Sequence, residues 1–400
     1  MQFHDRRLAP TPAISHCAVN HCNKVKMALL ASDMPGAAAK VQACEAAWTI
    51  DQGRSAAAHG LPCPLIRTRL ALLRMRIVCE QLFELEKQAI AARESGNTQA
   101  IHASQIASTN LWLSFGFGVA RSGLGNRVEQ ARLTTSVVSR VAGRGMSSME
   151  FSKSLSAEDY DFSRSFVERL TGQNLSRVSF AQAPRVDSAE AMAMACGRKD
   201  HVIVLPAGGY KAPDLLIHEL GHTAEFTVRR ATGDPKMLRT HRILSETVAY
   251  YCQFSYLRQH GTADQRQFAL AAFLPGYLAA QFIHVSGKKP NAQAKAMIGH
   301  PRFGALIEEY GPECLLQHIE SNRLTSLTTD EITHAYVEPL FSIPVALNLL
   351  QRGDPVQRVM MASADVSVIS ALQAVGINGL ASTDFRRISG LFNDFIDDTL

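Results

Sequence analysis

The clearest chemical potential in this sequence lies in five consecutive residues, 218–222, which read His-Glu-Leu-Gly-His. They stand in a run with helical rather than alternating character. Residues four apart lie on one face of a helix, so the imidazoles of His218 and His222 can share one Zn2+ ion. Glu219 reaches the same side and can hold a water that the ion polarises. The spacing therefore predicts a hydrolytic metal site with Glu219 as its general base.

The residues around this motif favour a buried helix. Pro213 and Asp214 come where its first turn is expected, and both residue types are favourable there. A bare H-E-x-x-H pattern is only moderately specific, and in a buried helix the two histidines could serve as hydrogen-bonding residues alone. That is the alternative interpretation. The apolar positions that favour burial are Leu215, Leu216, Ile217 and Leu220.

A catalytic zinc site of this kind needs a third protein ligand and an open position for water. Glu246 is a lone carboxylate in an apolar and aromatic part of a second expected helix, residues 238–260. It follows His222 by 24 positions, which leaves room for a turn at residues 233–235 and an antiparallel return. Burial of an unpaired carboxylate is costly, and metal ligation removes that cost. We therefore expect Glu246 to be the third ligand; an ordinary exposed glutamate is the alternative.

A short apolar run precedes the motif helix and ends at Pro206 and two glycines. Its residues Val202, Ile203 and Val204 are typical of a strand. An edge strand beside a metal site can pair with an extended peptide and hold it across the ion. We expect these three residues to bind substrate; a core strand without a ligand role is the alternative.

The motif and Glu246 together resemble the gluzincin zinc peptidases. Gly221 makes the motif similar to that of the thimet oligopeptidase and oligopeptidase F group. The resemblance covers roughly residues 202–350 and implies a zincin-like core, a Zn2+ cofactor and peptide hydrolysis. The chain departs from the group at Glu225, where the group usually has another histidine.

A later segment adds to this resemblance. His334-Ala335-Tyr336 resembles the H-x-Y helix of the same group. By that resemblance, Tyr336 and His334 are the donors that stabilise the oxyanion of the transition state. A second tyrosine that the group has several positions later is replaced in this chain.

Composition excludes other classes of function. The 400 residues, 46% hydrophobic and 19% charged, describe an ordinary globular protein. Ten of the 41 Lys/Arg and five of the 36 Asp/Glu lie in residues 1–80, so the remaining 320 residues carry equal numbers of both. The basic excess is remote from the motif, which argues against nucleic-acid binding there. The longest apolar stretch, residues 273–285, is too short and interrupted to span a bilayer.

The cysteines bear on the compartment. Eight cysteines without C-x-x-C spacing, in a chain of this length and without an evident secretory signal, favour a reducing, cytoplasmic location. Residues 1–62 are rich in Ala, Ser, His and Pro and are typical of a weakly ordered basic leader. Such a leader is equally compatible with a solvated tail and with a targeting arm for delivery into a host cell by a specialised secretion system.

The remaining chain divides into a helical N-terminal region, residues 63–175, and a zincin-like catalytic region with C-terminal helices, residues 176–400. A capped helix is expected from Ser156 to Leu170, because serine there is followed by an acidic first turn. A strand is expected at 177–180 and a helix at 188–196. The sequence thus predicts a mainly α protein with a small β-sheet next to the zinc helix.

These residues predict a zinc-dependent peptidase that acts on a peptide or protein substrate. His218, His222 and Glu246 hold the ion, and Glu219 takes a proton from the attacking water and passes it to the leaving amine. Two alternatives use the same motif. One is a secreted bacterial effector protease that cuts a specific host protein. The other is a catalytically silent, peptidase-like binding protein.

Overall fold

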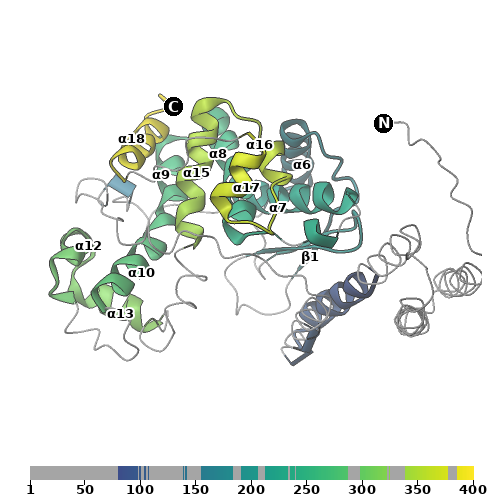
Figure 1. Cartoon of the computed structure of the whole chain (residues 1–400), viewed down its shortest axis with the longest axis horizontal. Helices are drawn as coiled ribbons and strands as arrows, with labels where there is room; N and C mark the ends of the chain where they lie inside the picture. Colours follow the sequence, from purple (N-terminus) through teal and green to yellow (C-terminus); the bar gives the residue numbers. More distant parts are fainter. Residues whose placement is uncertain are drawn as a thin grey trace, which may run out of the picture.

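The protein is mainly helical, with one small sheet beside the helix that carries the motif (Figure 1). The predicted fold class is therefore confirmed. In the computed structural model, the described residues are 80–97, 155–182, 191–205, 212–232, 235–238, 240–286, 298–321, 338–376 and 385–400, with residue 324 and a few single positions between 99 and 141.

Residues 80–94 form the first described helix. The labelled elements then follow in chain order. They are α6 (Ala157–Thr171), β1 (Ser179–Gln182), β2 (Met192–Met194), β3 (Val202–Leu205), α7 (Pro213–Ala231), η2 (Pro235–Leu238), α8 (Arg242–His260), α9 (Ala263–Ala271), α10 (Phe273–Ser286), η3 (Pro301–Phe303), α12 (Gly304–Tyr310), α13 (Pro312–Ser321), α15 (Glu338–Arg352), α16 (Val356–Met360), α17 (Val368–Ala374) and α18 (Phe385–Ile396).

The sheet has the strand order β1-β3-β2. Strand β1 pairs parallel to β3, with Ser179 opposite Val202, and β2 pairs antiparallel to β3, with Ala193 opposite Ile203. Two expectations are corrected here. β3 is the central strand and not an edge strand, and the helix expected at 188–196 is replaced, in its described part, by β2. The edge nearest the motif helix is therefore β2, which contacts α7.

Helix α6 forms where its sequence predicted it. Ser156 accepts from the backbone N–H of Asp159, and the Asp159 carboxylate accepts from the backbone N–H of Ser156, which completes a capping box. Gly172 ends the helix in the left-handed region, at φ 71°. Phe166 and Val167 are buried, and the helix packs against α7.

Helix α7 carries the motif and is almost entirely buried. Pro213 starts it, Asp214 lies in its first turn, and Arg229 and Arg230 lie in its last turn, as the helix dipole favours. Ala212 precedes it and makes no side-chain cap. The buried apolar face explains why the helix persists without that cap, since most helical stability comes from packing.

Helix α8 runs antiparallel to α7, because residues early in one contact residues late in the other. Asp214 pairs with Gln253, and Glu225 pairs with Ser245. On its other side α8 packs against α15, and the Ser342 hydroxyl there donates to the carbonyl of Ile243 at 3.2 Å. In Figure 1, α7, α8, α15 and α16 occupy the centre of the molecule. The core that fixes the motif helix is therefore made of helices.

A buried ion pair joins the helix at 80–94 to the end of α7. The Arg230 guanidinium donates to both carboxylate oxygens of Glu86, one of them at 2.8 Å, and to the carbonyl of Gly197 at 2.6 Å. It also lies over the Phe83 ring, 5.0 Å from its centroid.

Residues 1–62 lie outside the described residues, so the leader and the proposed boundary near 175 stay predictions.

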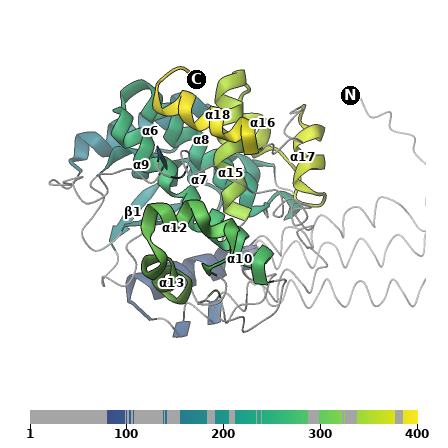
Figure 2. The ribbon, with the colours of Figure 1, turned by 90° about the vertical axis from the view of Figure 1, so that its left-hand side faces the viewer.

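Helices α12 and α13 lie below the central helices in both views (Figure 1, Figure 2). Between them and the core runs α10, which contacts α15. The expectation that the apolar stretch at 273–285 is too short to span a bilayer is corrected: within the described part of the chain it belongs to a helical stretch, Ala263–Val285, whose length and composition suffice, with a mean hydropathy of 1.5. In the 18-residue apolar window within this stretch, 67% is buried inside the protein, which is typical of a core helix.

Candidate metal centre

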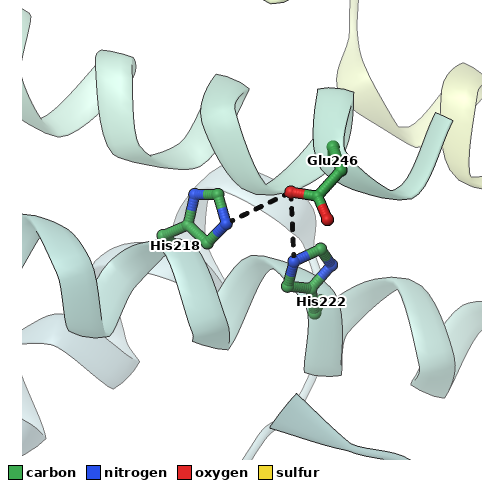
Figure 3. Close-up of side chains that lie close together, drawn as sticks. All are labelled: His218, His222 and Glu246. Atoms are coloured by element: carbon green, nitrogen blue, oxygen red, sulfur yellow. Dashed lines mark ion pairs between the residues drawn. The ribbon is translucent and has the colours of Figure 1, made fainter. Parts of the chain in front are cut away.

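Two facing helices bring His218, His222 and Glu246 to one point. The Nε2 atom of His218 lies 3.5 Å from Oε2 of Glu246, and the Nε2 atom of His222 lies 3.8 Å from the same oxygen. Figure 3 shows the two imidazoles on one helix and the carboxylate on the helix that faces it. One ligand atom from each residue lies within 4.8 Å of the other two. The structure thus brings together the three residues predicted as metal ligands.

Gly221 allows the two helices to come this close. A Cβ atom at this position would lie 2.9 Å from the Cα atom of Ala249 and 3.3 Å from the sulfur of Cys252. A backbone atom cannot move aside as a flexible side chain can, so any larger residue would push α8 away from α7. The glycine of the motif is therefore required by helix packing, and through it by the position of Glu246.

The ring nitrogen of His222 that does not face Glu246 forms a hydrogen bond with a hydroxyl group. Its Nδ1 atom lies 3.0 Å from the Ser245 Oγ atom, which donates to Oε2 of Glu225 at 2.5 Å. The other oxygen of Glu225 accepts from Nε of Arg229 at 2.7 Å. Glu225 is fully buried, and Arg229 is 2% exposed. Residues behind the ligands commonly fix ring orientation in metal sites.

The ring nitrogen of His218 that does not face Glu246 forms a hydrogen bond with a side-chain amide. Its Nδ1 atom lies 3.2 Å from Oε1 of Gln253, and the Gln253 side-chain nitrogen donates to Asp214 at 2.8 Å. Because a carboxylate only accepts, the amide nitrogen faces Asp214 and the amide oxygen faces the imidazole. The oxygen must then accept a hydrogen bond from Nδ1 of His218. In the neutral imidazole this places the lone pair on Nε2, the atom that faces Glu246.

These atoms fit a zinc ion. Tetrahedral Zn2+ holds nitrogen and oxygen ligands at about 2.0–2.2 Å, which places two ligand atoms about 3.3–3.6 Å apart. The two separations from Glu246 Oε2, 3.5 and 3.8 Å, are close to that range. Three acceptor atoms that face one another repel unless a proton or a metal cation lies between them. Two imidazoles and one carboxylate also leave a fourth position for water.

The charges around the ligands keep the Glu246 carboxylate ionised. Burial alone would raise the pKa of the Glu246 carboxyl, but His218, His222 and Arg242 hold the pKa down to about 2. Burial lowers the pKa of His218, yet the hydrogen bond to Glu246 and the charges of Glu219 and Glu246 raise it above its usual value overall. The site therefore keeps its carboxylate ionised, which is the form that ligates a metal.

Glu219, the predicted base, is fixed by the sheet. Its Oε2 atom accepts from the backbone N–H of Ala193 on β2 at 2.7 Å. The side chain is buried, with 9% exposure. Because it donates to Glu219 on α7, the N–H of Ala193 points away from the paired strand β3. The motif helix and the free edge of the sheet thus meet at this carboxylate.

The expected substrate role of Val202, Ile203 and Val204 is not supported. These residues pair with β1 on one side and with β2 on the other, so their backbone has no free edge. Ile203 is fully buried, and Val204 is 3% exposed. The physical reason is that β2, absent from the prediction, covers the edge that these residues were expected to offer. β3 is a core strand, as the alternative interpretation has it.

Two other side chains lie near the ligands. The Tyr250 ring packs edge-on against the His218 ring, with centroids 4.8 Å apart. The Nε atom of Arg242 lies 3.8 Å from Oε1 of Glu246. The predicted oxyanion donors Tyr336 and His334 lie outside the described residues.

Sequence reasoning missed several residues that position the site. Asp214 was assigned to the first helical turn and not to the chain behind His218. Glu225, one turn after His222 on the same helix, could be expected from its sequence either behind that ligand or at the surface, and the structure buries it. Ser245 and Gln253 gave none, because their contacts depend on how closely α7 and α8 approach.

Comparison with known proteins gave few matches. No protein-family model matches the chain, and no curated protein matches it. Among solved structures, the chain is similar to PZ peptidase A with an inhibitor, at 12% sequence identity and a TM-score of 0.47. The similarity covers 84% of this chain and 70% of that chain.

Proposed function

We propose that the protein is a zinc-dependent peptidase. The observation that carries the proposal is the convergence of His218, His222 and Glu246 on one point, with Glu219 held beside them by the sheet. Metal-assisted hydrolysis requires such a cluster of two imidazoles and one carboxylate, with a further carboxylate beside it that is not a ligand; here that carboxylate is Glu219. The similarity in the sequence to gluzincin peptidases agrees with that chemistry.

The residues of the site have distinct tasks in this proposal. His218, His222 and Glu246 would hold Zn2+, which supplies Lewis acidity toward a water and the scissile carbonyl. Glu219 accepts the proton of the attacking water and returns it to the leaving nitrogen. Tyr336 and His334 remain the proposed oxyanion donors, by resemblance alone.

The substrate in this proposal lies along β2 and not along β3. The N–H and C=O groups of one strand residue point to the same side, so the carbonyl of Ala193 also faces away from β3. An extended peptide can donate to that carbonyl and so add a strand to the sheet. The bond cleaved would then lie next to Glu219, which the same residue contacts.

The partner in this proposal is a peptide or protein chain. The compartment is reducing and cytoplasmic, in keeping with the free thiols of Cys196, Cys252 and Cys314.

The test combines metal analysis with a cleavage screen. Full-length protein, purified without chelators, is expected to contain about one equivalent of zinc and to cut members of a mixed peptide library. Glu219→Gln should keep the zinc and lose roughly 100-fold or more of the cleavage rate. Glu308→Gln, an exposed glutamate on α12, is the matched control and should retain both.

Two results would overturn the proposal. One is a wild-type protein that takes up no zinc even when Zn2+ is added. The other is a Glu219→Gln variant that cuts peptides as fast as the wild type, since no other residue described at the centre is placed to act as the base.

A further inference from the structure

The Ser245 hydroxyl connects a metal ligand to an ion pair in the protein core. Its oxygen lies 3.0 Å from Nδ1 of His222 and 2.5 Å from Oε2 of Glu225. Glu225 is paired in turn with Arg229, whose Nη2 atom donates to the carbonyl of Ala362 at 3.0 Å. Four side chains in a row thus run from the candidate metal centre to the segment after α16.

The direction of each hydrogen bond in this row follows from chemistry. A guanidinium only donates and a carboxylate only accepts, so Arg229 donates to Glu225. Ser245 has one hydroxyl proton, and it donates that proton in its hydrogen bond to Glu225. The hydroxyl oxygen can then only accept from His222, whose proton must reside on Nδ1. In the neutral imidazole the lone pair is then on Nε2, which faces Glu246, as a metal ligand requires.

Packing alone gives little reason for this ion pair. Glu225 is fully buried and Arg229 is 2% exposed. Within the described part of the chain, Nη1 of Arg229 has no hydrogen-bond partner. Apolar residues of similar size are often as stabilising as a buried ion pair, or more so. A charge kept at such a position is better explained by what it does to its neighbour.

We propose that Ser245 is a positioning residue that couples the buried Glu225–Arg229 pair to His222 and fixes that imidazole as an Nε2 metal ligand. The inference rests on the proposed zinc site. It deepens that proposal by naming the residues that make one ligand competent. His218 is fixed differently, by the neutral amide of Gln253, so the two ligands depend on separate sets of residues.

The test uses the full-length protein and compares Ser245→Ala, Ser245→Thr and Ser255→Ala. Ser255 is a matched control: it is 4% exposed on the same helix, and within the described residues its hydroxyl has no hydrogen-bond partner. Zinc affinity is measured by competition with a chromophoric chelator. Cobalt-substituted protein then reports the ligands by its visible spectrum and by the shifted, exchangeable N–H signals of the two ligand histidines in proton NMR.

Removal of a residue that orients a metal ligand typically weakens metal binding roughly 10- to 100-fold. We expect that loss in Ser245→Ala, with one histidine N–H signal lost to fast exchange and the other retained. Ser245→Thr keeps a hydroxyl and should recover most of the affinity. Ser255→Ala should match the wild type in both readouts.

The results separate the two proposals. If the wild type binds zinc and Ser245→Ala binds it within two-fold of the wild type with both N–H signals intact, the coupling through Ser245 is wrong and the zinc site stands. If Ser255→Ala loses as much affinity as Ser245→Ala, the effect belongs to helix packing, and the coupling is again wrong. If the wild type binds neither zinc nor cobalt, the proposed function itself fails.

Discussion

The backbone N–H of Ala193 lies 2.7 Å from the carboxylate of Glu219, so the edge strand of the sheet holds the proposed general base in place. The two residues are 26 positions apart and belong to different elements. The contact is made by a backbone group, which a substitution of the Ala193 side chain leaves in the chain. Only a change that removes the N–H itself tests the contact.

Ala193→Pro removes that N–H and is expected to lower the cleavage rate roughly 10- to 100-fold, as the loss of a hydrogen bond to a charged group predicts. Proline is tolerated on an edge strand where the N–H points outward, so the fold should persist. Zinc content and circular dichroism check that point. Ala193→Ser keeps the N–H and serves as control; equal losses in the two variants would show that the side chain, and not the N–H, matters.

Gly221→Ala is expected to destabilise the protein by about 1–3 kcal/mol and to weaken zinc binding. Its Cβ atom would lie 2.9 Å from the Cα atom of Ala249, so the helix that carries Glu246 must move away. Gly390→Ala is the matched control, because a Cβ atom at that position on α18 meets nothing within 4 Å. Urea denaturation and chelator competition measure both effects. A Gly221→Ala variant as stable and as tight in zinc binding as the wild type would contradict the packing argument.

His201 is expected to make the protein less stable in acid. Burial, with the charge of Arg230, lowers the pKa of His201 to about 3 from its usual 6.5. The unfolded chain therefore binds a proton between these pH values that the folded chain excludes. The free energy of unfolding therefore has its full value above pH 6.5 and falls as the pH falls toward 3. The loss is about 2 kcal/mol between pH 6.5 and 5.

The measurement is the free energy of unfolding at several pH values, for the wild type and for His201→Gln. Glutamine keeps an acceptor for the backbone N–H of Cys196, which His201 accepts through Nδ1 at 3.0 Å. The two proteins differ in no other residue, so the difference between the two curves isolates residue 201. Parallel curves would show that its protonation is not linked to folding.

The parts of the site that the sequence predicted are those set by helix periodicity. His218 and His222 share a face because they are four apart, and Glu246 stood out as one carboxylate in an apolar helix. The sheet edge was harder. Residues 188–196 are rich in alanine and methionine, which favour a helix, but pairing with β3 overrides that preference at Met192–Met194. Whether β3 was central or at an edge depended on that missed strand.

The contact between Arg229 and the carbonyl of Ala362 links the candidate metal centre to the last forty residues of the chain. Suppose that a protease cuts the chain before residue 362 and the tail is lost. The Arg229 guanidinium would then lose its hydrogen bond to the carbonyl of Ala362. Its partner Glu225 and the serine behind His222 would then be free to turn. Such trimming would also take the buried Phe392 and Phe395 out of the core, so it would weaken both the fold and the proposed metal binding, although all three proposed ligands would remain in the chain.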